Sequence, residues 1–237
     1  MTLRIYEPGH NIITDTDDLR HQVGLIEVAG RTCYKSEDKI REGSAADFIG
    51  RIVRSGHESV IEHGHAMVRI TGDRAMTHQL VRHRLCEYSQ ESQRYCDYGE
   101  HGFGVVCQES IGIIPPGPYS CRDGVWQHDE VGTIIDDFFS DQEKVALVKY
   151  WLDGVACAYS QYLHLREKGI KPQDARSLLP NATKTEIVMT TNFRVWRHIF
   201  KERGLNPHAQ WQIRGIMFNV LRDFAQIMPE VFGDLID

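Results

Sequence analysis

The feature that most constrains this fold is a long apolar repeat with the spacing of an α-helix. Apolar side chains recur every three or four positions between Asp141 and Lys168. The members of the repeat are Val145, Val148, Leu152, Val155, Tyr159 and Leu163. Side chains at this spacing share one face of a helix, and Gly169 ends the pattern. The rest of the chain must therefore supply an apolar surface that covers this face.

Shorter patterns surround this helix and alternate between helical and extended periodicity. We predict helices at 44–55, from Asp73 to His83, at 141–168, 172–180, 192–204 and 206–228, and strands at 66–70 and 183–190. Residues 99–141 carry turn signals around short apolar runs, which predict short strands and a long loop. The alternation predicts a mixed α/β (α+β) domain with a small, largely antiparallel sheet flanked by long helices.

Polar residues and proline mark the predicted helix starts. Ser44 and Asp73 are placed to act as N-caps, because their side-chain oxygens can accept a hydrogen bond from the first turn. Asn206-Pro207 has the composition of a helix start, so we expect the last long helix to begin there. The helix after Asp73 is predicted to extend along the chain as far as His83.

Length, composition and charge limit the class of protein. A chain of 237 residues with 41% hydrophobic and 25% charged residues can form one folded domain, which we expect over 1–237. The net charge of -6 argues against a nucleic-acid-coating surface. No apolar run is long enough for a membrane span, and the first residues lack the pattern of a secretory signal. We therefore expect a cytoplasmic protein with no membrane or nucleic-acid partner.

Cysteine and histidine patterns give little support to a metal site. The six cysteines are scattered without a C-x-x-C pair, so we interpret them as reduced packing residues. His57-Glu58 begins an H-E-x-x-H pattern, but Ile61 stands where the second histidine would be. His63 and His65 alternate near a strand start and leave a metal site as the alternative. Structural histidines without metal are the preferred interpretation.

The densest functional signal is Arg82-His83-Arg84, followed after seven residues by Ser92 and then Arg94. Guanidinium groups, an imidazole and hydroxyl groups at this density form an anion site when a helix end folds back on a loop. The alternative is a solvated basic helix end with acidic partners nearby. The chain also lacks G-x-G-x-x-G and G-x-x-x-x-G-K-[ST], so neither a Rossmann fingerprint nor a P-loop is present.

The stretch RHRLCEYSQESQRY from Arg82 to Tyr95 closely resembles the signature of the flavin-dependent thymidylate synthases. Three further stretches resemble the same family in the same order: Gly56-His57-Glu58-Ser59, Ala175 to Pro180, and Asn192-Phe193-Arg194 with Arg203 and the run from His208 to Ile213. The resemblance covers about residues 20–225. The segment 99–141 has no counterpart and is treated as variable, with no assigned role.

The resemblance implies a role for individual positions of this chain. The residues implied to contact FAD are His57, Ser59, Arg82, His83, Arg84, Gln90, Asn192, Arg194, His198 and His208. The residues implied to contact the nucleotide are Gln79, Arg82, Gln90, Glu91, Ser92, Gln93, Arg94, Arg176 and Arg203. Arg203 is also the implied catalytic residue, because its match in the family lies against the uracil edge.

The resemblance also implies the reaction and the assembly. Methylenetetrahydrofolate supplies a one-carbon unit to C5 of dUMP, and NADPH reduces the FAD, so that dTMP is made de novo. A homotetramer with sites shared between subunits is implied as well. Cys86 and Cys96 have no role in the family, so no cysteine nucleophile is expected. A UMP C5-methylase of the same family and a non-catalytic nucleotide- or RNA-binding module remain as alternatives.

Overall fold

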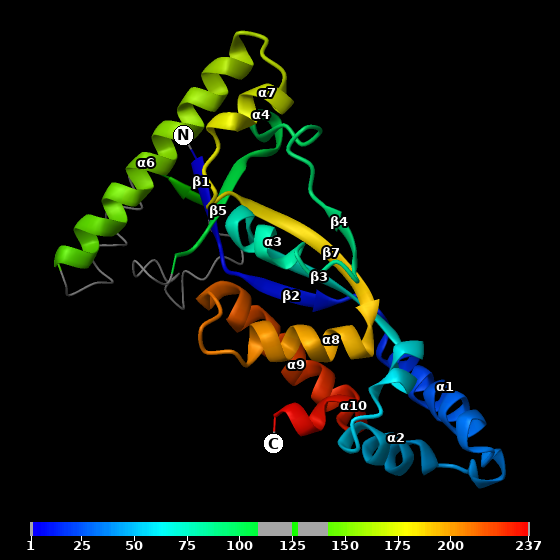
Figure 1. Cartoon of the computed structure of the whole chain (residues 1–237). Helices are drawn as coiled ribbons and strands as arrows, with labels where there is room; N and C mark the ends of the chain where they lie inside the picture. Colours follow the sequence, from blue (N-terminus) through cyan, green and yellow to red (C-terminus); the bar gives the residue numbers. More distant parts are fainter. Residues whose placement is uncertain (1, 109–124, 128–141, 237) are drawn as a thin grey trace. The chain divides into compact units, whose positions relative to one another are not determined.

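The computed structural model describes residues 2–108, 125–127 and 142–236, and most of the variable segment 99–141 lies outside them. These residues form a mixed α/β fold, which confirms the predicted fold class (Figure 1). They divide into two compact units. Unit 1 comprises 1–8, 71–78 and 90–186, and unit 2 comprises 9–70, 79–89 and 187–237.

A four-stranded antiparallel sheet has the strand order β2-β3-β7-β4. Its strands are β2 (Gly9–Ile12), β3 (His65–Asp73), β7 (Lys184–Asn192) and β4 (Glu87–Gln90). Alternate residues of β3 and β7 are buried, as expected for strands with one face against a core. The strands predicted at 66–70 and 183–190 are therefore confirmed as the centres of β3 and β7.

Unit 1 contains a three-stranded sheet of β1 (Thr2–Tyr6), β5 (Phe103–Val106) and β6 (Val125–Gln127). Strand β1 pairs in parallel with β5 and antiparallel with β6, so this sheet is mixed. The long helix predicted at 141–168 is confirmed as α6 (Gln142–Glu167). Its buried face includes Val145, Val148, Leu152, Val155 and Tyr159, and it packs in one core with residues of β1 and β5.

The long apolar face of α6 differs from the prediction at one position. Tyr162 is buried, whereas Leu163 is only partly buried. The Tyr162 hydroxyl donates a 2.9 Å hydrogen bond to the carboxylate of Asp97, which precedes α4 (Tyr98–His101). Arg166 donates from Nε to the same carboxylate at 2.9 Å. Tyr162 therefore takes the buried position instead of Leu163. Its ring fills the core, and its hydroxyl supplies a hydrogen bond to the buried carboxylate of Asp97.

Unit 2 is predominantly helical. Its helices are α1 (Thr16–Tyr34), η1 (Glu37–Lys39), α2 (Ser44–Arg54), η2 (Glu58–His63), α8 (Phe193–Ile199), the π-helix η6 (Phe200–Gly204), α9 (Trp211–Ile227), α10 (Pro229–Phe232) and η7 (Gly233–Leu235). Helices α8, α9 and α10 pack together (Figure 1). An aromatic cluster of Phe193, Trp196, Phe200, Phe224 and Phe232 fills the space between them.

Two predicted helix starts are wrong. Gly43, not Ser44, is the N-cap of α2, and the Ser44 hydroxyl instead donates to Glu27. Helix α9 begins at Trp211 rather than at Asn206-Pro207. The Asn206 side chain accepts a hydrogen bond from the backbone of His208, which makes a local turn, and Gln210 caps the helix.

The helix after Asp73 begins as predicted but ends early. Asp73 accepts a 2.6 Å hydrogen bond from the Met76 backbone, which confirms its role as a cap. The helix is α3 (Arg74–Leu80), so His83 lies beyond it. The predicted helix at 172–180 is shorter as well, with α7 (Pro172–Ala175) followed by the 3₁₀ turn η5 (Arg176–Leu178). Among the described residues, no helix is both long and apolar enough to cross a bilayer.

Candidate active site

The Arg82-His83-Arg84 segment forms a turn in unit 2 that two side chains hold in place. The Tyr88 hydroxyl donates to the carbonyl oxygens of Leu80 and His83, at 2.8 and 3.0 Å. The Thr191 hydroxyl donates to the carbonyl of Leu85 at 2.7 Å. The turn is therefore held through its backbone carbonyl groups, and the side chains of Arg82 and Arg84 remain exposed.

Helix α8 brings a second group of predicted residues beside this turn. The Asn192 side chain caps α8 by accepting from the Val195 backbone at 2.9 Å. Gly64 permits a close approach, since an added Cβ would lie 2.3 Å from the Phe193 ring. This contact places η2 next to the start of α8. Arg194 and His198, four residues apart, then lie on the same side of the helix.

The turn, η2 and α8 together enclose a cavity of about 990 Å³ within unit 2. It is lined by Glu58, Glu62, Arg82, His83, Arg84, Leu85, Glu87, Asn192, Arg194, Val195, His198 and Lys201. Six of the ten residues predicted to contact FAD are among them: Arg82, His83, Arg84, Asn192, Arg194 and His198. The fold thus gathers residues that are far apart in the sequence into one cationic cavity.

Arg203 and His83 form a polar contact at this cavity. The Arg203 Nε–H donates a 3.1 Å hydrogen bond to Nε2 of His83, so this imidazole nitrogen is unprotonated. The His198 ring lies edge-on to His83 with 6.1 Å between ring centroids. Burial, followed by the positive charge of Arg203, lowers the pKa of His83 below its usual range. His83 is therefore a neutral acceptor that orients Arg203.

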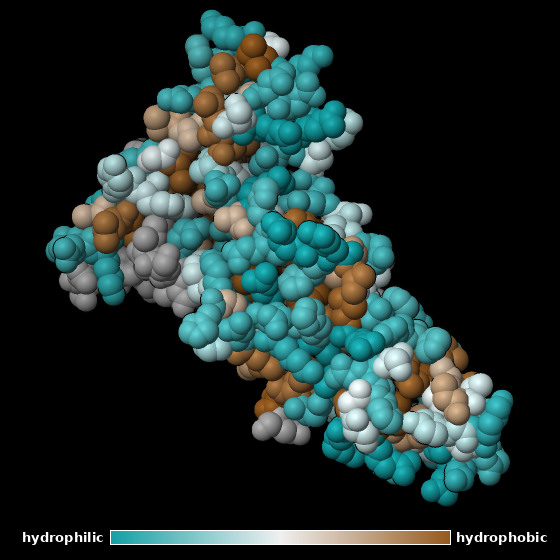
Figure 2. Space-filling view, in the orientation of Figure 1, coloured by the Kyte–Doolittle hydropathy of each residue, from teal (hydrophilic) through white to brown (hydrophobic). Residues whose placement is uncertain are grey.

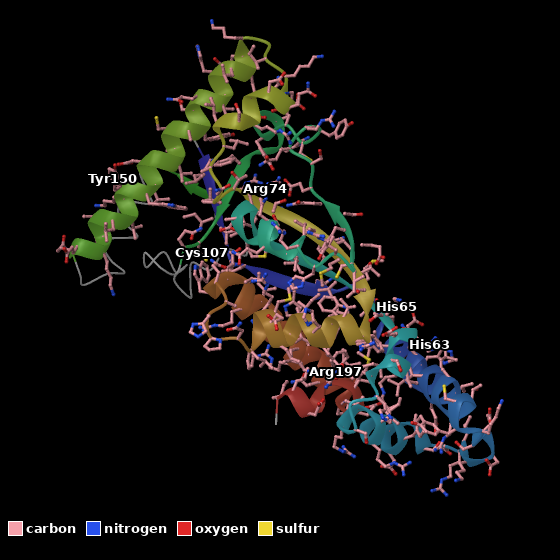
Figure 3. The ribbon with its side chains drawn as sticks, in the orientation of Figure 1. His63, His65, Arg74, Cys107, Tyr150 and Arg197 are labelled. Carbon is pink, nitrogen blue, oxygen red and sulfur yellow. The ribbon has the colours of Figure 1, made fainter. Side chains whose placement is uncertain are left out.

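A buried arginine anchors the cavity wall from behind. Arg197, on the inner side of α8 (Figure 3), is 2% exposed and donates from Nε to Glu58 at 3.0 Å. Its two terminal nitrogens bind both carboxylate oxygens of Asp234, at 2.6 and 2.7 Å. Because Glu58 lines the cavity, Arg197 fixes part of that wall. Glu62 likewise pairs with Arg194 across the cavity surface.

Other predicted residues of unit 2 lie outside the lining of this cavity. His57 and Ser59 are exposed at η2, and the His57 Nδ1 contacts the Tyr34 hydroxyl at 3.2 Å. His208 is exposed in the turn before α9. Gln79 is partly buried near the end of α3. Trp211 is partly buried at the first position of α9.

In unit 1 the predicted nucleotide residues from Gln90 to Arg94 are mostly bound to their own neighbours. The Gln90 amide donates to the hydroxyls of Thr77 and Thr185, at 2.9 and 3.3 Å. Glu91 accepts from the Tyr98 hydroxyl at 2.9 Å and from Lys184 at 3.2 Å. These polar groups therefore rigidify the segment.

The other predicted nucleotide residues of unit 1 are Arg94, Arg176, Ser92 and Gln93. Arg94 is exposed, and its guanidinium lies 5.6 Å from the centroid of the Tyr95 ring. Arg176 is partly buried and donates from Nε to the carbonyl of Gln173 at 3.1 Å. The Ser92 hydroxyl accepts a 3.3 Å hydrogen bond from the backbone N–H of Arg94. Gln93 is buried, with 9% of its surface exposed. The two guanidinium groups keep donors available for an anion.

Sequence reasoning missed Glu58, Glu62, Arg197 and Lys201 as parts of the cavity or its support. Glu58 stands inside the Gly56 to Ser59 motif, which was a usable signal. Arg197 follows Arg194 by three residues, but only its burial and its two acidic partners reveal its role. Burial raises the pKa of the Cys86 thiol, which opposes thiolate formation. Within the described residues, no group of three or more potential metal ligands occurs.

Comparisons with known proteins identify the family of this chain. Residues 16–230 match the family described as thymidylate synthase complementing protein. The chain is 36% identical over 226 residues to a flavin-dependent thymidylate synthase of Mycobacteroides abscessus, an alignment that covers 89% of this chain and 78% of that relative. It is also 36% identical over 222 residues to the Mycobacterium tuberculosis enzyme of the same name, with 92% and 82% covered.

Solved structures show the same fold. A UMP/dUMP methylase from Streptomyces cacaoi, bound with 5-Br dUMP, superposes with a TM-score of 0.73 at 20% identity. The superposition covers 98% of this chain and 96% of the methylase chain. At this identity the likeness shows the fold alone, whereas the sequence matches extend over nearly the whole chain at higher identity. The chain therefore belongs to the family of flavin-dependent thymidylate synthases.

Proposed function

We propose that this protein converts dUMP to dTMP in the cytoplasm, with methylenetetrahydrofolate as carbon donor and NADPH as the source of electrons. The observation that carries the proposal is the cavity of unit 2, where Arg82, His83, Arg84, Asn192, Arg194 and His198 come together. The proposal treats 1–237 as one catalytic domain. It also takes the assembly to be a homotetramer in which subunits share sites.

The residues of this cavity fit FAD. A volume of about 990 Å³ lies at the upper end of the range for small-molecule sites. Arg82, Arg84 and Arg194 offer guanidinium donors for a pyrophosphate, while Asn192 and His198 offer amide and imidazole groups for a flavin edge. His57, Ser59, Gln90 and His208 are further proposed contacts. When bound and reduced, FAD supplies the hydride that completes the methyl group.

Arg203 is the proposed catalytic residue, because uracil C5 is a weak nucleophile that must be activated. Its Nε is held by neutral His83 at 3.1 Å. Within the described part of the chain, its two terminal nitrogens have no hydrogen-bond partner, so they are available for the carbonyl edge of a pyrimidine. A preorganised donor at that edge stabilises the negative charge that develops there by roughly 3–4 kcal/mol.

The nucleotide phosphate is proposed to bind to Arg94 and Arg176, with Ser92 and Gln79 as hydrogen-bonding partners. A phosphate dianion gains roughly 1.5–3 kcal/mol from each charge-assisted contact. Arg82 is proposed to contact both FAD and the nucleotide. Gln90, Glu91 and Gln93 support the binding segment, because their side chains bind neighbouring hydroxyl groups or are buried. A second copy of the chain would complete the shared site.

Turnover of dUMP and UMP by the same FAD-loaded preparation tests this proposal. We expect dTMP to form from dUMP with methylenetetrahydrofolate and NADPH, and UMP to be a poor substrate. The alternative is a UMP C5-methylase, because the UMP/dUMP methylase of Streptomyces cacaoi has the same fold. Faster methylation of UMP than of dUMP would favour that alternative. Absence of methylation with both nucleotides, in a protein that binds FAD, would contradict both.

A further inference from the structure

A second cavity in unit 2 has a cationic lining that the proposed reaction has not used. It has a volume of about 660 Å³ and lies between the end of α1, η1 and α2. Its lining consists of Arg31, Asp38, Lys39, Arg41, Ser44, Asp47, Arg51 and Arg54, and we call it the basic cavity. Five cationic side chains and two carboxylates line it, although the whole chain has a net charge of -6. The basic cavity therefore carries a net positive charge, whereas the whole protein carries a net negative charge.

One of the five cations is a fixed part of the wall. Arg31 is 7% exposed and donates from Nε and Nη2 to the same Glu27 oxygen, at 3.1 and 2.9 Å. Its guanidinium also lies 4.4 Å from the centroid of the Phe48 ring. The Ser44 hydroxyl donates to Glu27 at 2.8 Å. Glu27 therefore neutralises Arg31 and ties α1 to the start of α2.

The other cations remain available. Within the part of the chain that the structure describes, Lys39, Arg41 and Arg54 are exposed and have no carboxylate within the 4.0 Å of an ion pair. Arg51 donates from Nε to the backbone carbonyl of Asp47 at 3.2 Å and keeps its terminal nitrogens for other partners. These four cations outnumber the two carboxylates of the lining, Asp38 and Asp47, so the basic cavity keeps a net positive charge that favours an anion.

The backbone adds to this positive field. Helix α2 begins at the basic cavity with Gly43 as its N-cap, and glycine has no side chain that could cap the first turn. The N-terminal end of a helix carries a partial positive charge that favours anions. Figure 2 shows hydrophilic residues interspersed with apolar ones over α1 and α2. Lysine and arginine stems can cover such apolar surface while their charged ends face water.

The basic cavity is joined to the proposed flavin contacts through a short stretch of chain. Arg54 ends α2, and His57, three residues later, is one of the proposed flavin contacts. His57 is also bound to Tyr34, the last residue of α1, through the 3.2 Å contact of Nδ1 with the hydroxyl. His57 is thus connected to α2 through the chain and to α1 through the contact with Tyr34.

We propose that the basic cavity binds the clustered anionic groups of a co-substrate. This inference rests on the proposed function, in which two co-substrates carry such groups away from their reactive ends. NADPH has phosphates on its adenosine half, and folates carry a chain of γ-linked glutamate carboxylates. The shared chemistry is a set of closely spaced negative charges, which Lys39, Arg41, Arg51 and Arg54 would bind together.

The test compares two triple variants of the FAD-loaded protein. The first changes Lys39→Gln, Arg41→Gln and Arg54→Gln. The control changes the exposed residues Arg69→Gln, Lys168→Gln and Arg214→Gln, which removes the same charge without touching the basic cavity. Calorimetry with inorganic tripolyphosphate measures anion binding directly. We expect the first variant to lose about tenfold or more in affinity, while the control stays close to the wild type.

Two further arms identify the source of the anion. Affinity for NADP⁺ is compared with that for NAD⁺, and affinity for pentaglutamyl tetrahydrofolate with that for the monoglutamyl form. In the first variant, one preference is expected to disappear while the control keeps both. Equal tripolyphosphate binding by the two variants would overturn the proposal, and so would unchanged preferences in both arms. Because calorimetry needs no turnover, an inactive wild type would contradict the proposed function without deciding this inference.

Discussion

In unit 2, six of the ten residues predicted to hold FAD line one cavity, whereas in unit 1 the residues predicted to hold the nucleotide are mostly bound by their own neighbours. Arg82, Arg84 and Arg194 reach the cavity from two separate segments. Gln90 and Glu91 instead bind threonine, tyrosine and lysine side chains of unit 1. A single chain therefore preforms the proposed cofactor site. The nucleotide half keeps few free donors, which is consistent with the proposal that a second copy completes it.

We expect the stability of unit 2 to depend on the buried Arg197 more than on any single residue of the cavity lining. Arg197→Met removes the hydrogen bonds to Glu58 and Asp234 and leaves two carboxylates without their main partner. Breaking a buried ion pair from one side costs about 3–5 kcal/mol, and partial exposure of both acids favours the lower end. Urea denaturation should show a loss of about 3 kcal/mol. Arg222→Met, at an exposed arginine of α9, is the control and should change stability little.

Arg203→Ala should have the largest effect on the reaction itself. We expect turnover to fall by about 100-fold or more while FAD stays bound, because one preorganised donor at the uracil edge is lost. The matched control is Arg214→Ala, at an exposed arginine of α9. Steady-state kinetics with dUMP measures both variants. Near-normal turnover of Arg203→Ala would refute the role assigned to this residue.

Arg94→Ala should distinguish nucleotide binding in unit 1 from FAD binding in unit 2, because we expect it to weaken nucleotide binding alone. Loss of one charge-assisted phosphate contact corresponds to roughly ten- to a hundredfold weaker binding. The KM for dUMP should rise by that factor, with kcat and FAD content nearly unchanged. Arg94→Lys keeps the charge and should recover part of the affinity. A fall in kcat at unchanged KM would place Arg94 at the reacting ring instead.

Acid should weaken unit 1 through Asp97. The hydrogen bonds from Arg166 lower the pKa of Asp97 to about 2. A carboxyl group with a depressed pKa stabilises the folded state above its unfolded pKa, about 3.9, and this contribution is lost as the pH falls towards 2. The wild type should lose stability in this range more steeply than Asp97→Asn. Parallel pH dependence of the two proteins would show that the ion pair does not matter.

The smallest effect is predicted for the thiols. Burial raises the pKa of Cys86, and the other described cysteines have no place in the proposed mechanism. Changing Cys86 and Cys96 together to serine should leave conversion of dUMP to dTMP within a few-fold of the wild type. Loss of turnover by several orders of magnitude in a folded, FAD-loaded variant would instead indicate attack by a thiolate.

Local patterns predicted much of the fold. The apolar spacing of 141–168 identified α6, and the Asp73 side chain caps α3 as its sequence position indicates. Predictions failed where a polar residue had a competing partner. Ser44 binds Glu27, which is 17 residues away, and so does not cap α2. Asn206 forms a turn with His208 and does not start a helix.

The site was predicted only as far as its motifs extend. The resemblance named Arg82 to Arg84, Asn192, Arg194 and His198, which the fold brings into one cavity. The support of that cavity could not be predicted, because Arg197 binds residues that are 139 and 37 positions away. The contact between Arg203 and His83 likewise depends on the π-helix Phe200–Gly204, which no sequence pattern indicated.

Titration of FAD into the purified protein tests the central claim, that the cavity of unit 2 holds the flavin. The variants are Arg84→Ala with Arg194→Ala in the cavity, and Arg94→Ala in unit 1 as the control. Flavin fluorescence quenching should show wild-type affinity in the control and a loss of about 100-fold or more in the cavity variant, which lacks two charge-assisted contacts. Undiminished FAD affinity in the cavity variant, or no FAD binding by the wild type, would contradict the account.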